Sequence, residues 1–164
     1  MDVTQLAKRV KLLLMDCDGV LTDGRLFLSN SGEALKVFNV RDGQGLVLWH
    51  EAGFASGIIS SRGAADIVKR RADELGVRFV RTKSQDKAQE VVDIADELGI
   101  KLDQVAYVGD DLGDLHAMSI VGLPIAVNDA VKVVAAMACY KTRKKGGRGA
   151  IREVVDMLLK AKLR

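Results

Sequence analysis

The sequence has little of what disulfide-bonded, zinc-binding or membrane-spanning proteins need. Its 164 residues include two cysteines and one proline, and no run reaches the ~20 apolar residues of a membrane span. Cys17 and Cys139 form neither a CxxC pair nor a zinc spacing, so we expect small buried residues in a reducing compartment. The start, MDVTQLAKRVK, lacks the basic region and apolar core of a secretory signal. We therefore expect a cytoplasmic protein with no membrane partner.

Aromatic residues are also few, at 4% of the chain, which bears on the basic segment near its end. The formal net charge is +3, and much of the positive charge lies after Tyr140, in KTRKKGGRG and the terminal KAKLR. A nucleic-acid contact is one interpretation of this segment. Because little aromatic interleaving and no recognised binding motif accompany it, a local anion site is simpler, and we expect no nucleic-acid partner.

Short β-branched runs alternate with helical patterns along the chain, whose length suits a single domain over residues 1–164. The runs predict six strands, at residues 10–16, 54–60, 77–81, 104–110, 123–127 and 139–142. Apolar spacing predicts helices at residues 63–76, 84–99, 114–122, 129–138 and 149–163. This alternation predicts an α/β fold of three layers, a Rossmann-like parallel sheet covered on both faces.

The segment GRLFLSNSGEALKVFNV interrupts the alternation. Two short apolar stretches flank a SNSGE turn, which predicts a β-hairpin over residues 25–40 that projects from the sheet. Its apolar residues have little core to join; they are Leu26, Phe27, Leu28, Val37 and Phe38. Because an exposed apolar hairpin usually finds a partner, we expect it to pack in an oligomer.

Aspartates follow two of the predicted strands. Asp16 and Asp18 come directly after the first strand, in LLLMDCDGVLTDG, and Asp110, Asp111 and Asp114 follow the fourth, in VGDDLGD. Ligands of open α/β sheets bind outside the carboxyl ends of the strands, so we expect these carboxylates to converge. Two unit charges ~4 Å apart repel by about 4 kcal/mol at an effective dielectric near 20. A divalent cation relieves that repulsion, and an all-oxygen ligand set favours Mg²⁺.

Magnesium beside a strand-end aspartate suggests phosphoryl transfer. Asp16 is the candidate nucleophile, which would form an aspartyl-phosphate, and Asp18 the candidate group that moves protons. Ser60 ends the second strand with a hydroxyl and a backbone N–H suited to phosphate, and Lys87 would supply a counter-charge. Alone, Ser60 is typical of a helix cap and Lys87 of an exposed lysine. Their order between DxD and GDD favours the catalytic interpretation.

DCDGVLTDG, the serine of IISSR, Lys87 and GDDLGD resemble, in order, the four motifs of the haloacid dehalogenase superfamily. The resemblance extends over nearly the whole chain and implies a magnesium-dependent phosphatase that works through an aspartyl-phosphate. It implies that Asp16 and Asp110 bind Mg²⁺ through their carboxylates and Asp18 through its backbone carbonyl, with Asp111 and Asp114 in support. No insertion here is long enough to be the cap domain that many members carry.

Within the superfamily, four details most resemble phosphatases of an eight-carbon sugar acid phosphate in lipopolysaccharide precursor synthesis: the hairpin sequence, Arg62, GDDLGD and TRKKGGRGAIREV. That resemblance implies a homotetramer built by the hairpins, and a tail over residues 141–164 that helps close a neighbouring subunit's site. Arginine forks suit the carboxylate and phosphate of such a substrate. The implied substrate contacts are Asn39, Val40, Arg41, Asp42, Gly43, Arg62, Arg71 and Lys87.

Two alternatives stay open at this point. The first is a related phosphatase of a sialic-acid-type 9-phosphate, although those relatives tend to carry an acidic residue where this chain has Arg62. The second is a non-catalytic oligomerising module of the same fold. It predicts a lost nucleophile or lysine, whereas Asp16 and Lys87 are both present.

Overall fold

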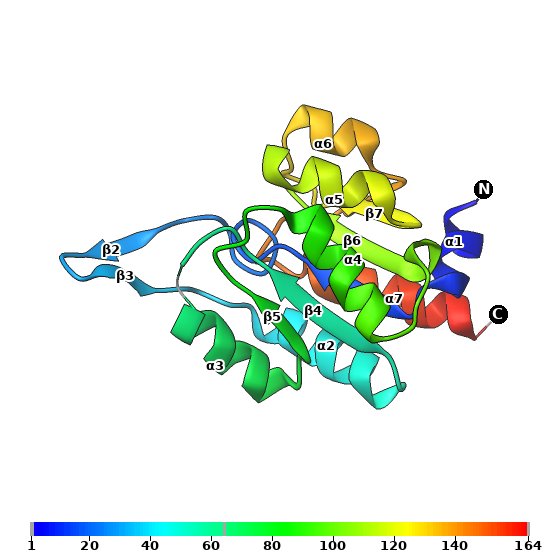
Figure 1. Cartoon of the computed structure of the whole chain (residues 1–164), viewed down its shortest axis with the longest axis horizontal. Helices are drawn as coiled ribbons and strands as arrows, with labels where there is room; N and C mark the ends of the chain where they lie inside the picture. The colour runs from blue at the N-terminus through cyan, green and yellow to red at the C-terminus, as the bar shows by residue number, and fades with distance from the viewer. Residues whose placement is uncertain (1, 64, 164) are drawn as a thin grey trace.

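A parallel sheet of six strands forms the centre of the protein, whose computed structural model describes residues 2–63 and 65–163 (Figure 1). Across the sheet the strands are β5 (Phe79–Arg81), β4 (Ala55–Ile59), β1 (Leu12–Met15), β6 (Val105–Gly109), β7 (Leu123–Ala126) and β8 (Tyr140–Lys141). Every pairing between these strands is parallel. The predicted fold class and all six predicted strands are therefore confirmed.

Helices cover both faces of the sheet and separate its core into two layers. One layer holds α1 (Val3–Arg9), α2 (Val40–Glu51), α3 (Ala65–Leu75) and α7 (Ala150–Lys162). The other holds α4 (Lys87–Glu97), α5 (Leu115–Ile120) and α6 (Lys132–Met137). Because successive strand residues point to opposite faces, Leu13 and Met15 of β1 join the first layer and Leu12 and Leu14 the second. Short 3₁₀ turns, η1 (Leu102–Gln104) and η2 (Leu112–Asp114), flank β6.

The predicted hairpin is present as β2 (Phe27–Ser29) and β3 (Gly32–Leu35), an antiparallel pair separate from the main sheet. Figure 1 shows it projecting away from the body, on the side opposite the two termini. The paired strands are shorter than the predicted residues 25–40, since residues 36–39 form neither strand nor helix and α2 begins at Val40. Leu26 and Leu28 are exposed by 44% and 68%, as expected for an apolar surface without a core to join.

Residues 141–163 are built into the body of the molecule. The Gly147 N–H donates to the Val20 carbonyl at 2.9 Å, in the loop that follows β1. Helix α7 then buries one side against the sheet, through Ile151, Val154 and Leu158. In this structure the basic, glycine-rich stretch therefore packs against the loop that follows β1 in the same chain, and the helix after it is part of the core.

Helix α1 is a difference from the sequence prediction, since its seven residues offer little periodicity. Cys17 is buried as expected, but Cys139 is exposed, so the expectation of burial is wrong for Cys139. The strand to which the sequence assigned it begins one residue later, at Tyr140. Among the described residues, no helix combines the length and apolar character that crossing a membrane requires.

Candidate active site

The loop after β1 places Asp16 at the carboxyl edge of the sheet. The Asp16 N–H donates to the Val108 carbonyl of β6 at 3.0 Å, which extends the sheet pairing by one residue. The chain then turns at Gly19, whose φ of +96° is a conformation that glycine adopts without strain. A β-carbon at Gly19 would lie 2.1 Å from Asp110 Oδ2, so glycine also leaves room for that carboxylate.

Asp114 fixes the second loop, which follows β6. Its Oδ2 accepts the Asp110 N–H at 2.9 Å and the Asp111 N–H at 3.3 Å. Its Oδ1 accepts the Tyr107 hydroxyl at 2.9 Å and the Lys87 ammonium at 2.8 Å. Since both oxygens are engaged, Asp114 shapes the loop and holds Lys87 in place. The sequence pattern missed Tyr107; the signal for it is a phenol within an apolar strand, which needs a partner when buried.

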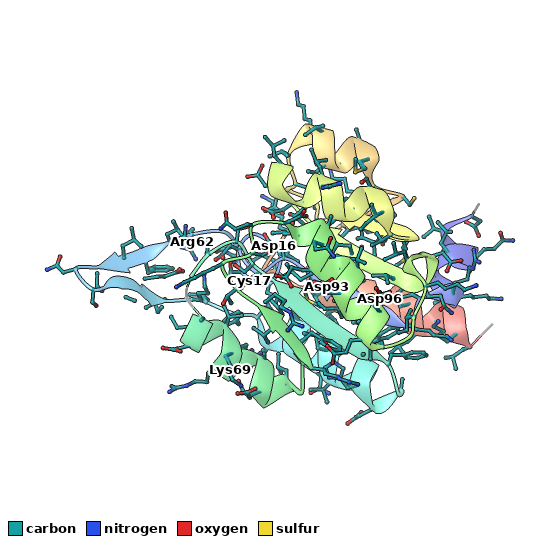
Figure 2. All side chains as sticks on the ribbon, in the orientation of Figure 1. Asp16, Cys17, Arg62, Lys69, Asp93 and Asp96 are labelled. Atoms are coloured by element: carbon teal, nitrogen blue, oxygen red, sulfur yellow. The ribbon has the colours of Figure 1, made fainter. Side chains whose placement is uncertain are left out.

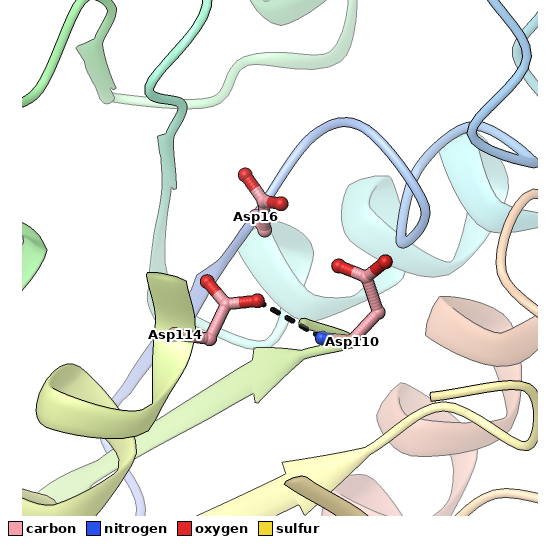
Figure 3. A group of neighbouring side chains, drawn as sticks. All are labelled: Asp16, Asp110 and Asp114. Atoms are coloured by element: carbon pink, nitrogen blue, oxygen red, sulfur yellow. Dashed lines mark hydrogen bonds between the residues drawn. The ribbon is translucent and has the colours of Figure 1, made fainter. Parts of the chain in front are cut away.

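Asp16, Asp110 and Asp114 converge, as their strand-end positions predicted. Each offers a carboxylate oxygen, and the three atoms lie within 4.8 Å of one another (Figure 3). Burial, followed by the charge of Asp114, raises the pKa of Asp16 to about 6. Burial, followed by the charge of Asp16, raises the pKa of Asp110 to about 8. These raised pKa values show that the three carboxylates need a nearby positive charge to be ionised together.

Lys87 supplies part of that charge. Its Nζ lies 2.8 Å from Asp16 Oδ1 and 2.8 Å from Asp114 Oδ1. Burial alone would lower the pKa of Lys87, but the nearby Asp16 and Asp114 charges outweigh burial and raise it. An ammonium ion held between two carboxylates stays protonated, so Lys87 is a fixed cation at the edge of the cleft.

The cluster fits a magnesium ion. Its donors are hard carboxylate oxygens, the ligand type that Mg²⁺ prefers. Asp110 Oδ1 is buried and has no hydrogen-bond partner among the described residues, which leaves it free to ligate. A divalent cation beside Asp16 and Asp110 would also reverse the rise in their pKa values. Asp114 is less suited, since its oxygens already accept four hydrogen bonds.

Asp18 lies at the same cleft but its carboxylate is held apart from the cluster. Its Oδ1 forms an ion pair with Lys36, which comes from the end of the hairpin. Its Oδ2 has no hydrogen-bond partner within the described ranges. Sequence reasoning missed Lys36 altogether, because no spacing signal connects a hairpin lysine to a loop eighteen residues earlier.

Ser60 and Arg62 line a cleft of about 330 Å³, together with Asp16, Asp18, Lys87 and residues 110–114. The Ser60 N–H donates to the Arg81 carbonyl at 2.8 Å. The expectation that this N–H would serve a phosphate is therefore wrong, since the sheet uses it, and the hydroxyl is what remains. Arg62 Nε lies 3.6 Å from Glu33 Oε2, and the Arg62 side chain is 43% exposed.

The remaining predicted residues are not members of the cluster of Asp16, Asp110 and Asp114. Asp111 lines the cleft at its exposed end, where its side chain caps η2 by accepting the Leu112 N–H at 2.7 Å. Asp42 is buried and accepts the Gly149 and Arg152 N–H groups at 3.1 and 2.9 Å, so it caps α7. The other predicted substrate contacts do not line the cleft; they are Asn39, Val40, Arg41, Gly43 and Arg71.

Their placement has physical reasons. Asn39 caps α2 by accepting the Arg41 N–H at 2.8 Å, which fixes the segment as a helix start. Arg71 packs against Gly43 and lies over the Phe38 ring, with its charge paired to Glu74 at 2.8 Å. Contact between substrate and the 39–43 segment or Arg71 stays a prediction.

The parallel sheet, the strand-end aspartates and the buried lysine are those of a haloacid dehalogenase-like hydrolase. The family model with that description matches residues 69–154. The 3-deoxy-D-manno-octulosonate 8-phosphate phosphatase of Yersinia pestis is 42% identical, over 98% of this chain and 85% of the relative. The phosphatase of that name from Escherichia coli K12 is 43% identical, with the same coverage. The chain therefore belongs to the haloacid dehalogenase-like hydrolase family.

Solved structures give the same similarity in three dimensions. The crystal structure of the Yersinia pestis phosphatase matches with a TM-score of 0.95 and 42% identity, over 98% of this chain and 86% of that one. The Moraxella catarrhalis phosphatase, solved with a magnesium ion, a phosphate ion and a KDO molecule, matches with a TM-score of 0.94 and 40% identity. That match covers 98% of this chain and 92% of that one.

Proposed function

We propose that this protein is a magnesium-dependent phosphatase that hydrolyses 3-deoxy-D-manno-octulosonate 8-phosphate to the free sugar acid and phosphate. The observation that carries the reaction is the position of Lys87, 2.8 Å from both Asp16 and Asp114 at a cluster of three aspartates. A non-catalytic module has no need for a buried cation beside a strand-end carboxylate. Burying charged groups costs desolvation energy even when they are paired, and such clusters of buried charge are typical of functional sites.

In the first step, an Asp16 oxygen attacks phosphorus and the bond between phosphorus and the sugar oxygen breaks. Asp18 gives a proton to that oxygen as it leaves, so a neutral alcohol departs and Asp16 carries the phosphoryl group. Lys87 and the Ser60 hydroxyl stabilise the negative charge of the phosphoryl oxygens. Lys87 also keeps the neighbouring carboxylate ionised, because its charge lowers the pKa of Asp16.

In the second step, a water molecule attacks the phosphorus of the aspartyl-phosphate. Asp18 takes a proton from this water, the bond between Asp16 and phosphorus breaks, and inorganic phosphate is released. The two aspartates have their original protonation states again. Because Asp18 moves protons in both steps, its carboxylate must stay apart from the metal ligands, as its pairing with Lys36 keeps it.

Asp16 and Asp110 would hold the magnesium ion with their carboxylates, and Asp18 with its backbone carbonyl. When bound, the ion neutralises charge on the phosphate oxygens and on the carboxylates. The relative from Moraxella catarrhalis, solved with magnesium and phosphate, supports this cofactor.

The substrate proposal comes from the named relatives and from Arg62. Relatives over 40% identical along 98% of the chain are phosphatases of this eight-carbon sugar acid phosphate. Arg62 lines the cleft, where its guanidinium fits an anionic substrate. We also propose a homotetramer assembled through the exposed hairpin residues, and a cytoplasmic location, which suits two free thiols.

The test is phosphate release in the presence of magnesium from three substrates. These are 3-deoxy-D-manno-octulosonate 8-phosphate, a sialic-acid-type 9-phosphate and para-nitrophenyl phosphate. We expect kcat/KM to favour the first by about a hundredfold or more, equivalent to roughly 2.7 kcal/mol of transition-state binding. A preference for the nine-carbon compound would overturn the substrate and keep the chemistry.

The control for the chemistry is Asp16→Asn, since an amide is a poor nucleophile. Asp16→Asn should keep its fold and lose turnover of all three substrates. The matched variant is Asp96→Asn, an exposed aspartate on α4 (Figure 2), which should keep full activity. Full activity of Asp16→Asn would remove Asp16 from the nucleophile's role and overturn the proposed reaction.

A further inference from the structure

A charged side chain at the end of the hairpin contacts a residue of the candidate site. Lys36 follows the last residue of β3, and its side chain is only 1% exposed. The ammonium forms ion pairs with Asp18 Oδ1 and, at 2.7 Å, with Glu33 Oε1. A lysine on a projecting hairpin would ordinarily extend into water, so this burial needs a reason.

Burying an ammonium ion is costly unless charged partners compensate for the lost hydration. Here the compensation comes from two directions, Asp18 in the loop after β1 and Glu33 on β3. The ion pair between Lys36 and Asp18 connects the hairpin to the loop after β1, although the hairpin strands belong to a separate sheet from β1. Lys36 is thus the direct link between the hairpin and the aspartate proposed to move protons.

The geometry at Asp18 shows what this link does. Lys36 engages only Oδ1, while Oδ2 has no hydrogen-bond partner in the part of the chain that the structure describes. The ion pair at Oδ1 fixes the orientation of the Asp18 carboxyl group, and it leaves the buried Oδ2 without a hydrogen-bond partner among the described residues. The cleft that Asp18 lines is where the leaving oxygen and the attacking water must lie.

Glu33 holds Lys36 from the opposite side. Its Oε1 accepts from Lys36, and its Oε2 lies 3.6 Å from Arg62 Nε. The Glu33 side chain is 7% exposed, so the pair is largely shielded from water and from screening by salt. Lys36 is therefore fixed between two carboxylates, which makes it a rigid support for Asp18.

We propose that Lys36, anchored by Glu33, is a positioning residue that orients Asp18 for proton transfer to the leaving oxygen. The inference rests on the proposed function, since it assigns a support to the proton-transfer role of Asp18. It adds a task for the hairpin within its own subunit, besides assembly.

The experiment compares kcat/KM for two small substrates, phenyl phosphate and para-nitrophenyl phosphate. Phenolate is the more basic leaving group and needs the proton more, and neither compound uses the sugar contacts. The ratio kcat/KM reports on steps up to the departure of the leaving group. General acid catalysis contributes typically 10²–10⁴-fold, so misplacing the acid should cost part of that range. For Lys36→Met we expect a loss on phenyl phosphate about tenfold greater than on para-nitrophenyl phosphate.

The matched control is Lys69→Met, another lysine in an ion pair, which lies exposed on α3 away from Asp16 (Figure 2). It should leave both values unchanged. Lys36→Arg keeps the cation, so it should lose much less activity on phenyl phosphate than Lys36→Met does. Glu33→Gln should also lose more kcat/KM on phenyl phosphate than on para-nitrophenyl phosphate, by a smaller factor. If Lys36→Met fails to fold, Glu33→Gln is the variant that tests the positioning role.

Equal losses on the two substrates in Lys36→Met, or in Glu33→Gln where that variant decides, would overturn the positioning role and leave the phosphatase intact. Failure of the proposed function has a different signature, in which Asp16→Asn and the wild type release phosphate at the same rate. In that case the positioning role of Lys36 would be overturned together with the proposed function.

Discussion

Gly147 lies against Thr22 so closely that a β-carbon on it would sit 2.4 Å from the Thr22 carbonyl carbon. Its N–H donates to Val20 at 2.9 Å in the same loop. The preceding residue, Gly146, is also in contact, since a β-carbon there would lie 1.7 Å from the Gly19 oxygen. The basic, glycine-rich stretch therefore determines where the loop that carries Asp16 and Asp18 can lie.

We expect Gly147→Ala to damage both stability and turnover. Gly147 has a φ of +64°, where alanine costs about 1–2 kcal/mol, and overpacking adds about 1–3 kcal/mol. The matched variant is Gly99→Ala, because Gly99 has a φ of +63° with no atom within 4 Å of its β-carbon position. Denaturant unfolding and phosphate release should show the larger loss in Gly147→Ala. Equal losses would mean that the contact with Thr22 does not constrain the loop.

The contact between Gly147 and Thr22 joins distant parts of the chain, and contacts of this kind could not be predicted from the sequence. The apolar run before Asp16 and the motif order predicted the strands and the convergence of Asp16 with Asp110, because strand ends of a parallel sheet meet at one edge. The ion pair between Lys36 and Asp18 could not be predicted, since it depends on how the hairpin folds back. The capping of α7 by Asp42 likewise joins residues over a hundred positions apart, which no local pattern encodes.

We expect the stability of the metal-free protein to fall as pH rises. Asp110 has its pKa raised from 3.8 to about 8, chiefly by burial and then by Asp16, so the folded state retains a proton that the unfolded state releases. The stabilisation from this proton is complete below the unfolded pKa of 3.8 and is lost as pH rises through about 8. Melting temperatures in chelator from about pH 5 to about pH 9 test this loss.

Magnesium should reverse the fall, so the melting temperature gained from the ion should be larger at alkaline than at acidic pH. A difference of at least about 3 °C corresponds to about 1 kcal/mol in a chain of this size. Asp110→Asn should flatten the pH dependence in chelator, and the exposed Asp96→Asn should keep it. A metal-free protein whose melting temperature does not change over this range would contradict the raised pKa of Asp110.

Lys87→Met should lower kcat by about a hundredfold or more, the usual cost of removing one preorganised electrostatic group. The charge of Lys87 lowers the pKa of Asp16, so the loss of Lys87 should raise that pKa. Because only ionised Asp16 can attack phosphorus, the acidic limb of the pH profile of kcat/KM should move to higher pH. The exposed Lys160→Met on α7 is the matched control and should leave rate and profile unchanged. An unshifted acidic limb in Lys87→Met would separate Lys87 from the ionisation of Asp16.

Leu28→Asp tests whether the hairpin assembles the protein. Leu28 is 68% exposed on β2, and burying a leucine at an interface contributes about 1.5–3 kcal/mol, whereas burying an unpaired carboxylate costs more. We expect the wild type to sediment as a tetramer and Leu28→Asp as a smaller species. Leu163→Asp makes the same change at a leucine that is 89% exposed beyond the end of α7, so it should leave the mass unchanged. If Leu28→Asp stays a tetramer, the interface does not include the tip of the hairpin. If the wild type is a monomer, the proposal that the hairpin assembles the protein is overturned.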